Sequence, residues 1–286
     1  MQGHIVSTHF LRQDLAQQTT AAHLLDWAAA RAAQAEAVDV YRNKEGRKTF
    51  RYRYLRQSYF VKLHGGVGWR EIIKNLLQLR LPVLGASNEF HAVNALSSAG
   101  VDTLSVAAYI SAGFNPATLQ SVLVTDDLAG TLSLEDYCAD WLNHPPDSST
   151  RIRLLIKLAD TARRMHAMGI NHRDFYLCHF HLDVDSLTQQ HIRCYLIDLH
   201  RAQRRARVPL RWQVKDLAGV YFSAMDCGLT RKDLLRFMHH YCDGGLHEAL
   251  GRRLGLWRKV ATTARKLYIK DHGIEPPPLA GSGWLK

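Results

Sequence analysis

The sequence predicts an α+β fold, in which a strand-rich N-terminal part precedes a mainly helical C-terminal part. β-prone runs bounded by turn residues occur at 38–64 and 103–128. Apolar residues recur at helical spacing through most of 133–273. With 286 residues, the chain is long enough for two modest lobes around a shared cleft.

The N-terminal part is expected to form an antiparallel sheet with helices. An Ala- and Leu-rich stretch at 21–38 predicts a helix, and two β-prone runs then flank the turn sequence NKEG. A further strand, YFVKL, follows at 59–63. The remaining segments are a loop and helix at 65–81, a helix at 86–100 that ends at Gly100, and buried strands at 103–111 and 120–128.

Helical patterns dominate the C-terminal part. The clearest one covers 150–169, where Gly169 is a stop signal. The other predicted elements are helices at 133–142, 211–228, 231–243 and 256–273, and a short strand within 194–200. We therefore divide the chain into an N-terminal lobe at 1–128, a helical lobe at 129–275 and an extended tail at 276–286.

The composition indicates a folded protein with anionic partners. Hydrophobic residues make up 47% of the chain and charged residues 22%, which excludes extensive disorder. Lys and Arg total 37 against 26 Asp and Glu, a net charge of +11. This charge suits nucleic acid, an acidic membrane surface, a phosphorylated or carboxylated glycan, or an acidic carrier protein.

We expect the chain to stay in the cytoplasm. It has no apolar run of the ~18 residues that a membrane helix needs, and its first residues lack the basic-then-apolar order of a secretory signal. Its five cysteines include no CxxC pair, which predicts reduced, buried thiols rather than disulfides or a zinc site.

Four residues occur in an order that suits phosphoryl transfer. Lys62 lies in the apolar run YFVKL, where an ammonium is costly unless an anion pairs with it. Glu89, on a later helix, is a candidate partner. Asp174 follows in the tripeptide HRD and Asp198 ends the apolar run LID. Transfer from ATP needs a cation on the phosphates, a carboxylate that holds it, a metal-binding carboxylate and a carboxylate near the attacking hydroxyl.

Taken singly, these features have plainer interpretations. Lys62 could extend from an edge strand to water, an isolated HRD arises by chance, and Asp198 could cap a turn. The GGVG at 65–68 lacks the Lys-Ser/Thr of a nucleotide loop, which favours a flexible connection. His172, His179 and His181 lack a cysteine or carboxylate at ligand spacing, which favours packing over a transition-metal site.

The order of these residues resembles the protein kinases, and longer strings resemble one family closely. KLHGGVGWREIIKNLLQLRLPVLGASNEF, GINHRDFYLCHFHL and LIDLHRAQ are similar to the lipopolysaccharide core heptose(I) kinases of Gram-negative bacteria. The similar strings lie between Lys62 and Ala218, over half of the chain. The resemblance implies a bilobal protein-kinase-like fold, with ATP and Mg²⁺ as cofactors.

The resemblance also implies a role for each matching residue. Asp174 is the catalytic base, and Asp198 is a Mg²⁺ ligand. His172 and Arg173 shape the catalytic loop, and Asp216 braces it from a helix. The residues implied at ATP are Lys62 on the phosphates, Glu89 as its partner, and Asp126 to Leu128 at a hinge that meets adenine.

Three departures from the kinase pattern affect these roles. His179 stands where protein kinases carry the asparagine for a second metal, so we expect either one metal or a different second site, with His179 as a candidate ligand. Leu199 and His200 replace the Phe and Gly after the metal-binding aspartate. Only Gly46 marks the first hairpin, so no multi-glycine loop covers the phosphates.

We therefore expect an ATP-dependent kinase that phosphorylates a hydroxyl of the first heptose in the lipopolysaccharide inner core. The alternatives are a paralogous kinase for another core sugar and a non-catalytic kinase-like binding module. The anionic, membrane-anchored acceptor implies peripheral association with the cytoplasmic face of the inner membrane. The basic runs at 200–207 and 251–266 are candidate contacts for acceptor phosphates and carboxylates. An acidic carrier protein is a further candidate partner, and nucleic acid is not expected as one.

Overall fold

A computed structural model of the protein describes residues 6–44, 46–77 and 84–280. The chain divides into two compact units, the first formed by Met1–Asn94 and Leu104–Ala129 and the second by Ala95–Thr103 and Gly130–Lys286. The change of unit at 129/130 lies next to the expected boundary at 128/129. The excursion of 95–103 into the second unit was not expected, and it divides helix α4 (Ser87–Ser98) between the units.

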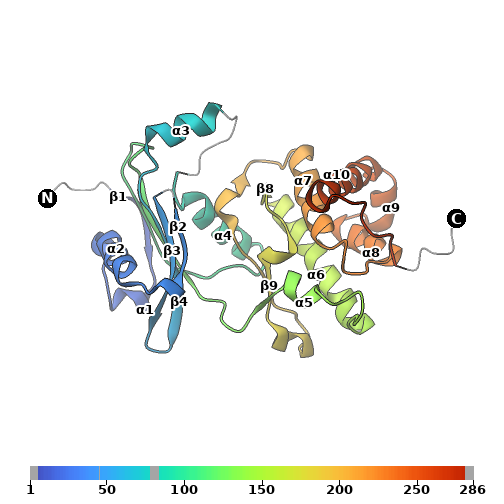
Figure 1. Ribbon diagram of the computed structural model, residues 1–286, viewed down its shortest axis with the longest axis horizontal. Coiled ribbons are helices and arrows are strands. Elements are labelled where there is room, and N and C mark those ends of the chain that lie inside the picture. Colours follow the sequence, from blue (N-terminus) through green and yellow to red (C-terminus); the bar gives the residue numbers. More distant parts are fainter. Residues whose placement is uncertain (1–5, 45, 78–83, 281–286) are drawn as a thin grey trace. The chain divides into compact units, whose positions relative to one another are not determined.

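The first unit contains a six-stranded antiparallel sheet (Figure 1). Its strands lie in the order β1-β5-β6-β4-β3-β2. The strands are β1 (Val6–Leu11), β2 (Val40–Lys44), β3 (Arg47–Tyr54), β4 (Gln57–His64), β5 (Val106–Ala112) and β6 (Gln120–Asp126). Five of them match predicted strands. Strand β1 was not predicted; it pairs with β5 and forms one edge of the sheet.

N-terminal helices cover one face of this sheet. The helical segments are α1 (Gln13–Ala16), η1 (Ala21–His23) and α2 (Leu24–Gln34). From α2, Leu24, Trp27 and Ala28 pack in one buried cluster with Phe50 and Val61 of the sheet. The helix predicted at 21–38 therefore closes the core of the first unit, a role that the sequence left open.

A second cluster covers the opposite face. Phe90 of α4 stacks on Tyr109 of β5 with ring centroids 4.1 Å apart, and Leu123 of β6 packs beside them. Helix α3 (Gly68–Leu77) follows β4, and residues 78–81 of the helix predicted there lie outside the described residues. The two clusters hold the sheet between helices, with β4 in the first cluster and β5 and β6 in both.

The second unit is mainly helical. Its helices are α5 (Leu134–Cys138), α6 (Ser148–Ala167), α7 (Leu210–Ser223), α8 (Arg231–Tyr241), α9 (Gly245–Leu250) and α10 (Leu254–His272). Asp147 caps α6 by accepting from the N–H groups of Ser149 and Thr150, and Thr230 forms a capping box with Asp233 at α8. All of these helices except α9 were predicted.

Short strands support the loops of the second unit. They are β7 (Leu132–Ser133), β9 (Phe180–Leu182) and β10 (Cys194–Leu196) in one sheet, and β8 (Ile170–Asn171) and β11 (Gln203–Arg204) in another. The 3₁₀ segments of the chain beyond η1 are η2 (Ala37–Asp39), η3 (Leu177–His179), η4 (Val184–Thr188) and η5 (Leu199–Arg201). Of these strands only β10 was predicted. The others were missed because strands of two or three residues show no alternation that a sequence pattern can reveal.

All five cysteines are free; four are buried and Cys178 is half-buried. In the tail, Ala280 pairs with Thr230, and residues 281–286 lie outside the described part. Over the described ranges, no helix combines the length and the apolar character that a membrane crossing needs.

Candidate active site

Lys62 and Glu89 form a buried ion pair in the first unit. Lys62 lies on β4, where its pairing with Thr49 of β3 and Leu123 of β6 fixes the backbone. Its Nζ lies 2.5 Å from Oε1 of Glu89, in the first turn of α4. The Glu89 side chain is 1% exposed and the Lys62 side chain 19%. An ammonium at the sheet surface that is held by a buried carboxylate suits a role at an anionic phosphate.

Two glycine segments meet beside this strand. Gly46, in the turn between β2 and β3, adopts φ +70°, and its carbonyl accepts the N–H of Gly65 at 2.7 Å. A Cβ on Gly66 would lie 2.3 Å from the carbonyl oxygen of Ala117, so only glycine fits there. The segment at 65–68 is therefore held against two neighbouring loops, which differs from the flexible connection that the sequence favoured.

The predicted hinge begins at the end of β6. The Asp126 carboxylate accepts two hydrogen bonds from Arg12, at 2.6 and 2.8 Å, and its backbone N–H donates to Ser105. The backbone N–H of Asp127 donates to Ser58. Leu128 is half-buried. Arg12, which the sequence did not single out, thus ties the end of β6, where the predicted hinge begins, to the N-terminal segment.

Asp216 braces the loop at His172 and Arg173, which is the predicted catalytic loop, in the second unit. This aspartate on α7 is completely buried. Its carboxylate accepts the backbone N–H groups of His172 at 2.8 Å and Arg173 at 2.7 Å, and it lies 3.3 Å from Nε2 of His166. Arg173 has φ +80°, an unfavourable conformation for a residue with a side chain. The two charge-assisted bonds to Asp216 compensate for that strain and fix the loop.

His172 holds the loop from inside. Its Nε2 donates to the carbonyl of Ile197 at 2.9 Å, and its Nδ1 accepts the backbone N–H of Asp174 at 3.3 Å. This arrangement requires the neutral imidazole with its proton on Nε2. Complete burial lowers the pKa of His172, which favours the same neutral form.

Asp174 lies at the centre of these contacts. One guanidinium nitrogen of Arg201 donates to both carboxylate oxygens of Asp174, each at 2.9 Å. The carbonyl of Asp174 accepts a hydrogen bond from Nδ1 of His179 at 2.6 Å. Arg201 belongs to the basic run at 200–207, but the sequence did not indicate which member of that run contacts the predicted base.

The β9–β10 hairpin brings Asp198 beside His179. Leu196 pairs with Phe180, and the N–H of Ile197 donates to the carbonyl of His179 at 3.0 Å. Asp198 follows with φ +61°, which turns its carboxylate toward His179 Nε2, 3.5 Å away, and His200 Nδ1, 2.5 Å away. Burial disfavours the charged His179 ring, but hydrogen bonds to Cys178 and the Asp174 carbonyl and the charge of Asp198 outweigh it and raise its pKa to about 9.

The donor set at Asp198 fits a magnesium ion. Mg²⁺ in kinases is held by one or two carboxylates together with substrate phosphates. The Asp198 side chain is 34% exposed, so its oxygens are accessible. Within the described ranges, no group of three or more His, Cys, Asp and Glu side chains forms a complete metal cage. The exposed Asp198 carboxylate and the lack of a complete cage agree with a site in which one carboxylate holds Mg²⁺ and nucleotide phosphates would supply further ligands.

Comparisons with known proteins agree with this arrangement. Residues 31–241 match the model of the lipopolysaccharide kinase (Kdo/WaaP) family. The chain belongs to this family. It is 47% identical over 230 residues to lipopolysaccharide core heptose(I) kinase WaaP of Escherichia coli, an alignment that covers 80% of this chain and 87% of that protein. WaaP of Pseudomonas aeruginosa is 46% identical, with coverage of 80% and 86%.

A solved structure confirms the α+β fold. A structure described as WaaP in complex with acyl carrier protein matches with a TM-score of 0.77 and 37% identity, over 91% of this chain and 99% of that one. The predicted resemblance to the heptose(I) kinases is thereby confirmed. Since members of the lipopolysaccharide kinase (Kdo/WaaP) family are kinases, the chain is an ATP-dependent phosphotransferase.

Proposed function

We propose that the chain uses ATP to phosphorylate a hydroxyl of the first heptose in the lipopolysaccharide inner core. The observation that carries this proposal is the identity of 46–47% to heptose(I) kinases over most of their length. The net charge of +11 supports it, because an acceptor rich in acidic groups is attracted to a basic enzyme.

The geometry suggests a role for each site residue. Lys62, held by Glu89, neutralises charge on the ATP phosphates, and backbone groups near Asp126 and Leu128 contact adenine. Asp174 orients the acceptor hydroxyl and accepts its proton as the phosphoryl group is transferred. Arg201, on the Asp174 carboxylate, positions that base and contributes positive charge beside the transferred group.

Asp198 is the proposed Mg²⁺ ligand, and His179 is a candidate second ligand. A bound Mg²⁺ neutralises charge that develops on the phosphates. His179 donates from Nδ1 to the Asp174 carbonyl, so Nε2 is the nitrogen that faces Asp198. A proton on Nε2 would have to leave before that nitrogen could ligate a cation. The same hydrogen bond makes His179 a link between the base and the metal-binding carboxylate.

Transfer of labelled γ-phosphate from ATP to purified core acceptors tests this function. The acceptors should end at the first heptose, carry further core sugars, or lack heptose altogether. We expect label on every acceptor that has the first heptose and none on the heptose-free acceptor. Label that appears only when a later sugar is present would favour the paralogous kinase, and absence of transfer to all acceptors would favour the binding module.

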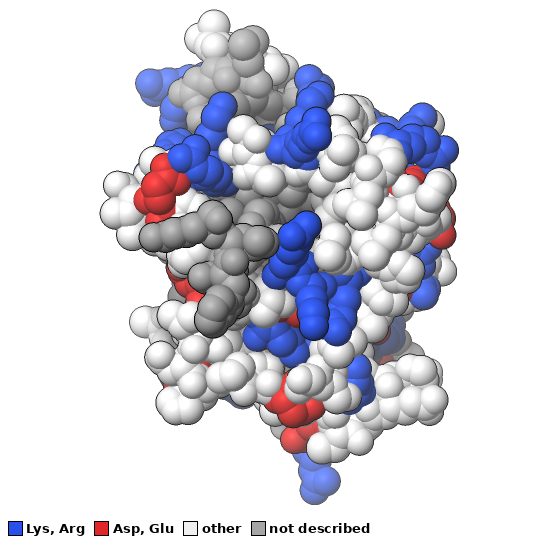
Figure 2. All heavy atoms as spheres, turned by 90° about the vertical axis from the view of Figure 1, so that its right-hand side faces the viewer, with Lys and Arg blue, Asp and Glu red and all other residues white. Residues whose placement is uncertain are grey.

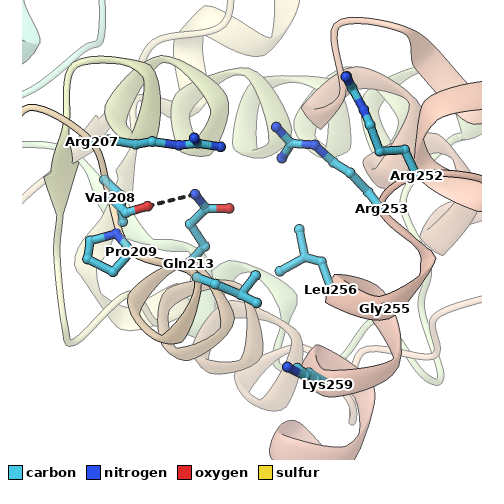
Figure 3. A pocket seen from close by; sticks show the side chains of 10 residues that line it. Arg207, Val208, Pro209, Gln213, Arg252, Arg253, Gly255, Leu256 and Lys259 are labelled. Atoms are coloured by element: carbon cyan, nitrogen blue, oxygen red, sulfur yellow. Dashed lines mark hydrogen bonds between the residues drawn. The ribbon is translucent and has the colours of Figure 1, made fainter.

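We also propose that an acidic carrier protein binds the chain. A similar WaaP structure is described as a complex with acyl carrier protein. On the face shown in Figure 2, Lys and Arg side chains gather near the middle. A hollow of about 830 Å³ in the second unit has an apolar floor that includes Val208 and Leu256 and a basic rim that includes Arg207 and Lys259 (Figure 3). Arg207 and Lys259 have no ion-pair partner among the described residues, and such a rim suits an acidic protein.

A titration with acyl carrier protein tests this partner. We expect Arg207→Glu to weaken binding at least ten-fold, whereas Lys232→Glu, which reverses an exposed charge on α8, should change it little. If the wild type and both variants bind acyl carrier protein equally well, the hollow is not part of the interface.

Helix α3 supports the proposed peripheral attachment to the inner membrane. Its exposed apolar side chains recur every three or four residues and so form one face: Trp69, Ile73, Leu76 and Leu77, exposed by 55, 52, 51 and 80%. Arg70 and Lys74, also exposed, provide positive charge on the same helix. An apolar face with basic flanks is typical of helices that lie in the surface of an anionic membrane.

Flotation with vesicles that contain anionic lipid tests this attachment. Trp69→Ser combined with Leu77→Ser should reduce the bound fraction, because it removes the two ends of the apolar face. The control is Val38→Ser, at an exposed apolar residue outside α3. Undiminished flotation of the double variant would exclude α3 as the attachment element.

A further inference from the structure

Four cations surround the ring of Trp212, at the start of α7. The distances from the ring centroid are 5.3 Å to Cζ of Arg173, 6.0 Å to Cζ of Arg205, 5.3 Å to Cζ of Arg211 and 5.6 Å to Nζ of Lys215. We call these four cations and the ring the Trp212 cluster. All of its members belong to the second unit.

The aromatic ring does not account for this concentration of charge. A cation gains a modest attraction from the electron-rich face of a tryptophan. Four like charges grouped around one ring also repel one another, and that repulsion grows where the side chains are partly buried. The arrangement therefore calls for negative charge that the ring itself does not provide.

The described residues provide little of that negative charge. Arg205 donates to the neutral oxygens of Asn171 and Gln203, at 2.6 and 2.7 Å. Nε of Arg173 is buried without a hydrogen-bond partner in the described structure. Arg211 and Lys215 form no ion pair with any described residue.

The two nearest carboxylates already have partners. Asp174 is bound by Arg201, and Asp216 accepts the loop N–H groups. Burial lowers the pKa of Lys215; Asp174 opposes this shift, whereas the charges of Arg201 and Arg173 add to it. The pKa of Arg173 is likewise lowered, first by burial and then by Arg201. The cluster thus carries an excess of positive charge.

A hollow opens beside the cluster. It has a volume of about 600 Å³ and lies along α7 and α10. Arg211 and Lys215 line it from α7, and Arg258, Lys259, Thr262 and Thr263 line it from α10. None of its described lining residues is acidic. Four cations and two hydroxyls around a space of this size suit a sugar that carries a carboxylate or a phosphate.

The cluster also adjoins the proposed base. Arg173 precedes Asp174 in the chain, and Lys215 lies within electrostatic range of the Asp174 carboxylate. We infer that the Trp212 cluster and its hollow bind an anionic group of the acceptor glycan, a carboxylate or a phosphate, and so position the accepting hydroxyl at Asp174. This inference rests on the proposed function and assigns the acceptor side of the same site.

Steady-state kinetics of Arg211→Gln and Lys215→Gln test the inference. Arg211 is exposed and Lys215 half-buried, and neither forms a hydrogen bond or an ion pair with the described residues of the loop, so both variants should fold. We expect KM for the core acceptor to rise about ten- to hundred-fold in each variant, as for loss of a hydrogen bond to a charged group. The kcat at saturating acceptor and KM for ATP should change less than about three-fold, because the reacting groups remain.

Two matched variants separate charge from structure. Lys215→Arg keeps the positive charge and should restore most of the affinity for the acceptor. Lys232→Gln removes an exposed positive charge from α8 and should leave all constants unchanged. A rise in KM for ATP alone in Lys215→Gln would mean that the cluster serves the nucleotide, and would overturn the inference.

Modified acceptors identify the anion. One preparation should have its carboxylates reduced, and another its phosphates removed enzymatically. One modification should raise KM for the acceptor in the wild type but leave KM unchanged in Lys215→Gln. The group that this modification removes is the anion that the cluster binds. If both modified acceptors behave as the untreated one does, the inference is wrong.

A binding assay without ATP keeps this inference distinct from the proposed function. The core acceptor should quench tryptophan fluorescence in the wild type, and this component should be lost in Trp212→Phe and weakened in Lys215→Gln. Binding with these properties but without phosphate transfer would contradict the proposed function and support the site. Phosphate transfer without any contribution of Trp212 or Lys215 to acceptor binding would support the proposed function and contradict the inferred site.

Discussion

Replacement of Asp216 by asparagine should loosen the catalytic loop while the fold is kept. The carboxylate is completely buried and accepts the N–H groups of His172 and Arg173 at 2.8 and 2.7 Å. Asparagine has nearly the same shape, but only one of its two terminal atoms accepts hydrogen bonds. One backbone N–H therefore loses its partner, and the other keeps a neutral acceptor in place of a charged one.

The cost follows from these two changes. A buried N–H without a partner costs about 1–3 kcal/mol, and loss of charge assistance in the second bond costs about 1 kcal/mol. The second unit should lose about 2–4 kcal/mol, which corresponds to a decrease in its Tm of roughly 4–16 °C. Since Arg173 has φ +80°, its loop conformation should relax and kcat should fall by at least ten-fold.

Differential scanning calorimetry and acceptor kinetics measure the two effects. Asp243→Asn is the matched control, because that side chain is 83% exposed and contacts Arg163 at 3.3 Å. We expect the control to unfold within about 1 °C of the wild type. If Asp216→Asn also unfolds within 1 °C of the wild type and keeps its kcat, the brace does not hold the loop.

Three further predictions concern other parts of the site. Lys62→Met should raise KM for ATP and lower kcat, because it removes the phosphate cation and leaves Glu89 buried without its partner; unchanged ATP kinetics would exclude this role. Stability of the second unit should fall as pH falls below about 6.5, because the unfolded chain protonates His172 there while burial keeps the folded imidazole neutral. His172→Gln should flatten that pH dependence in urea titrations, and an unchanged slope would contradict the assignment. His179→Asn, which introduces the protein-kinase residue, should keep substantial activity but change the Mg²⁺ concentration for half-maximal rate; an unaltered Mg²⁺ dependence would place His179 outside the metal site.

The sequence was most informative where one strong pattern coincided with one chemical requirement. Lys62 in an apolar strand predicted a buried partner, and the structure pairs it with Glu89. The resemblance to the kinase family implied that Asp216 braces the loop after HRD, and the structure shows two backbone hydrogen bonds to Asp216. The first contact could be predicted from the residues because β4 and α4 have clear patterns, whereas the second depended on the resemblance.

Partners that depend on tertiary structure could not be predicted. The run at 200–207 contains several arginines of similar local context, but Arg201 binds Asp174, Arg205 binds Asn171, and Arg207 lines the hollow of Figure 3. No periodicity distinguishes these roles, because each depends on a loop that folds back from another part of the second unit. Strand β1 was missed for a related reason, since its short run gains order from pairing with β5.

In the proposed reaction, Asp174 is the general base for phosphate transfer from ATP to the core heptose. Single-turnover transfer of labelled γ-phosphate to the purified heptosylated core measures this directly, with Asp174→Asn compared to the wild type at saturating ATP. We predict that the wild type labels the first heptose and that Asp174→Asn is slower by at least about 100-fold, as for loss of a general base, while ATP still binds. Transfer by Asp174→Asn at the wild-type rate, or no transfer by the wild type, would contradict the account.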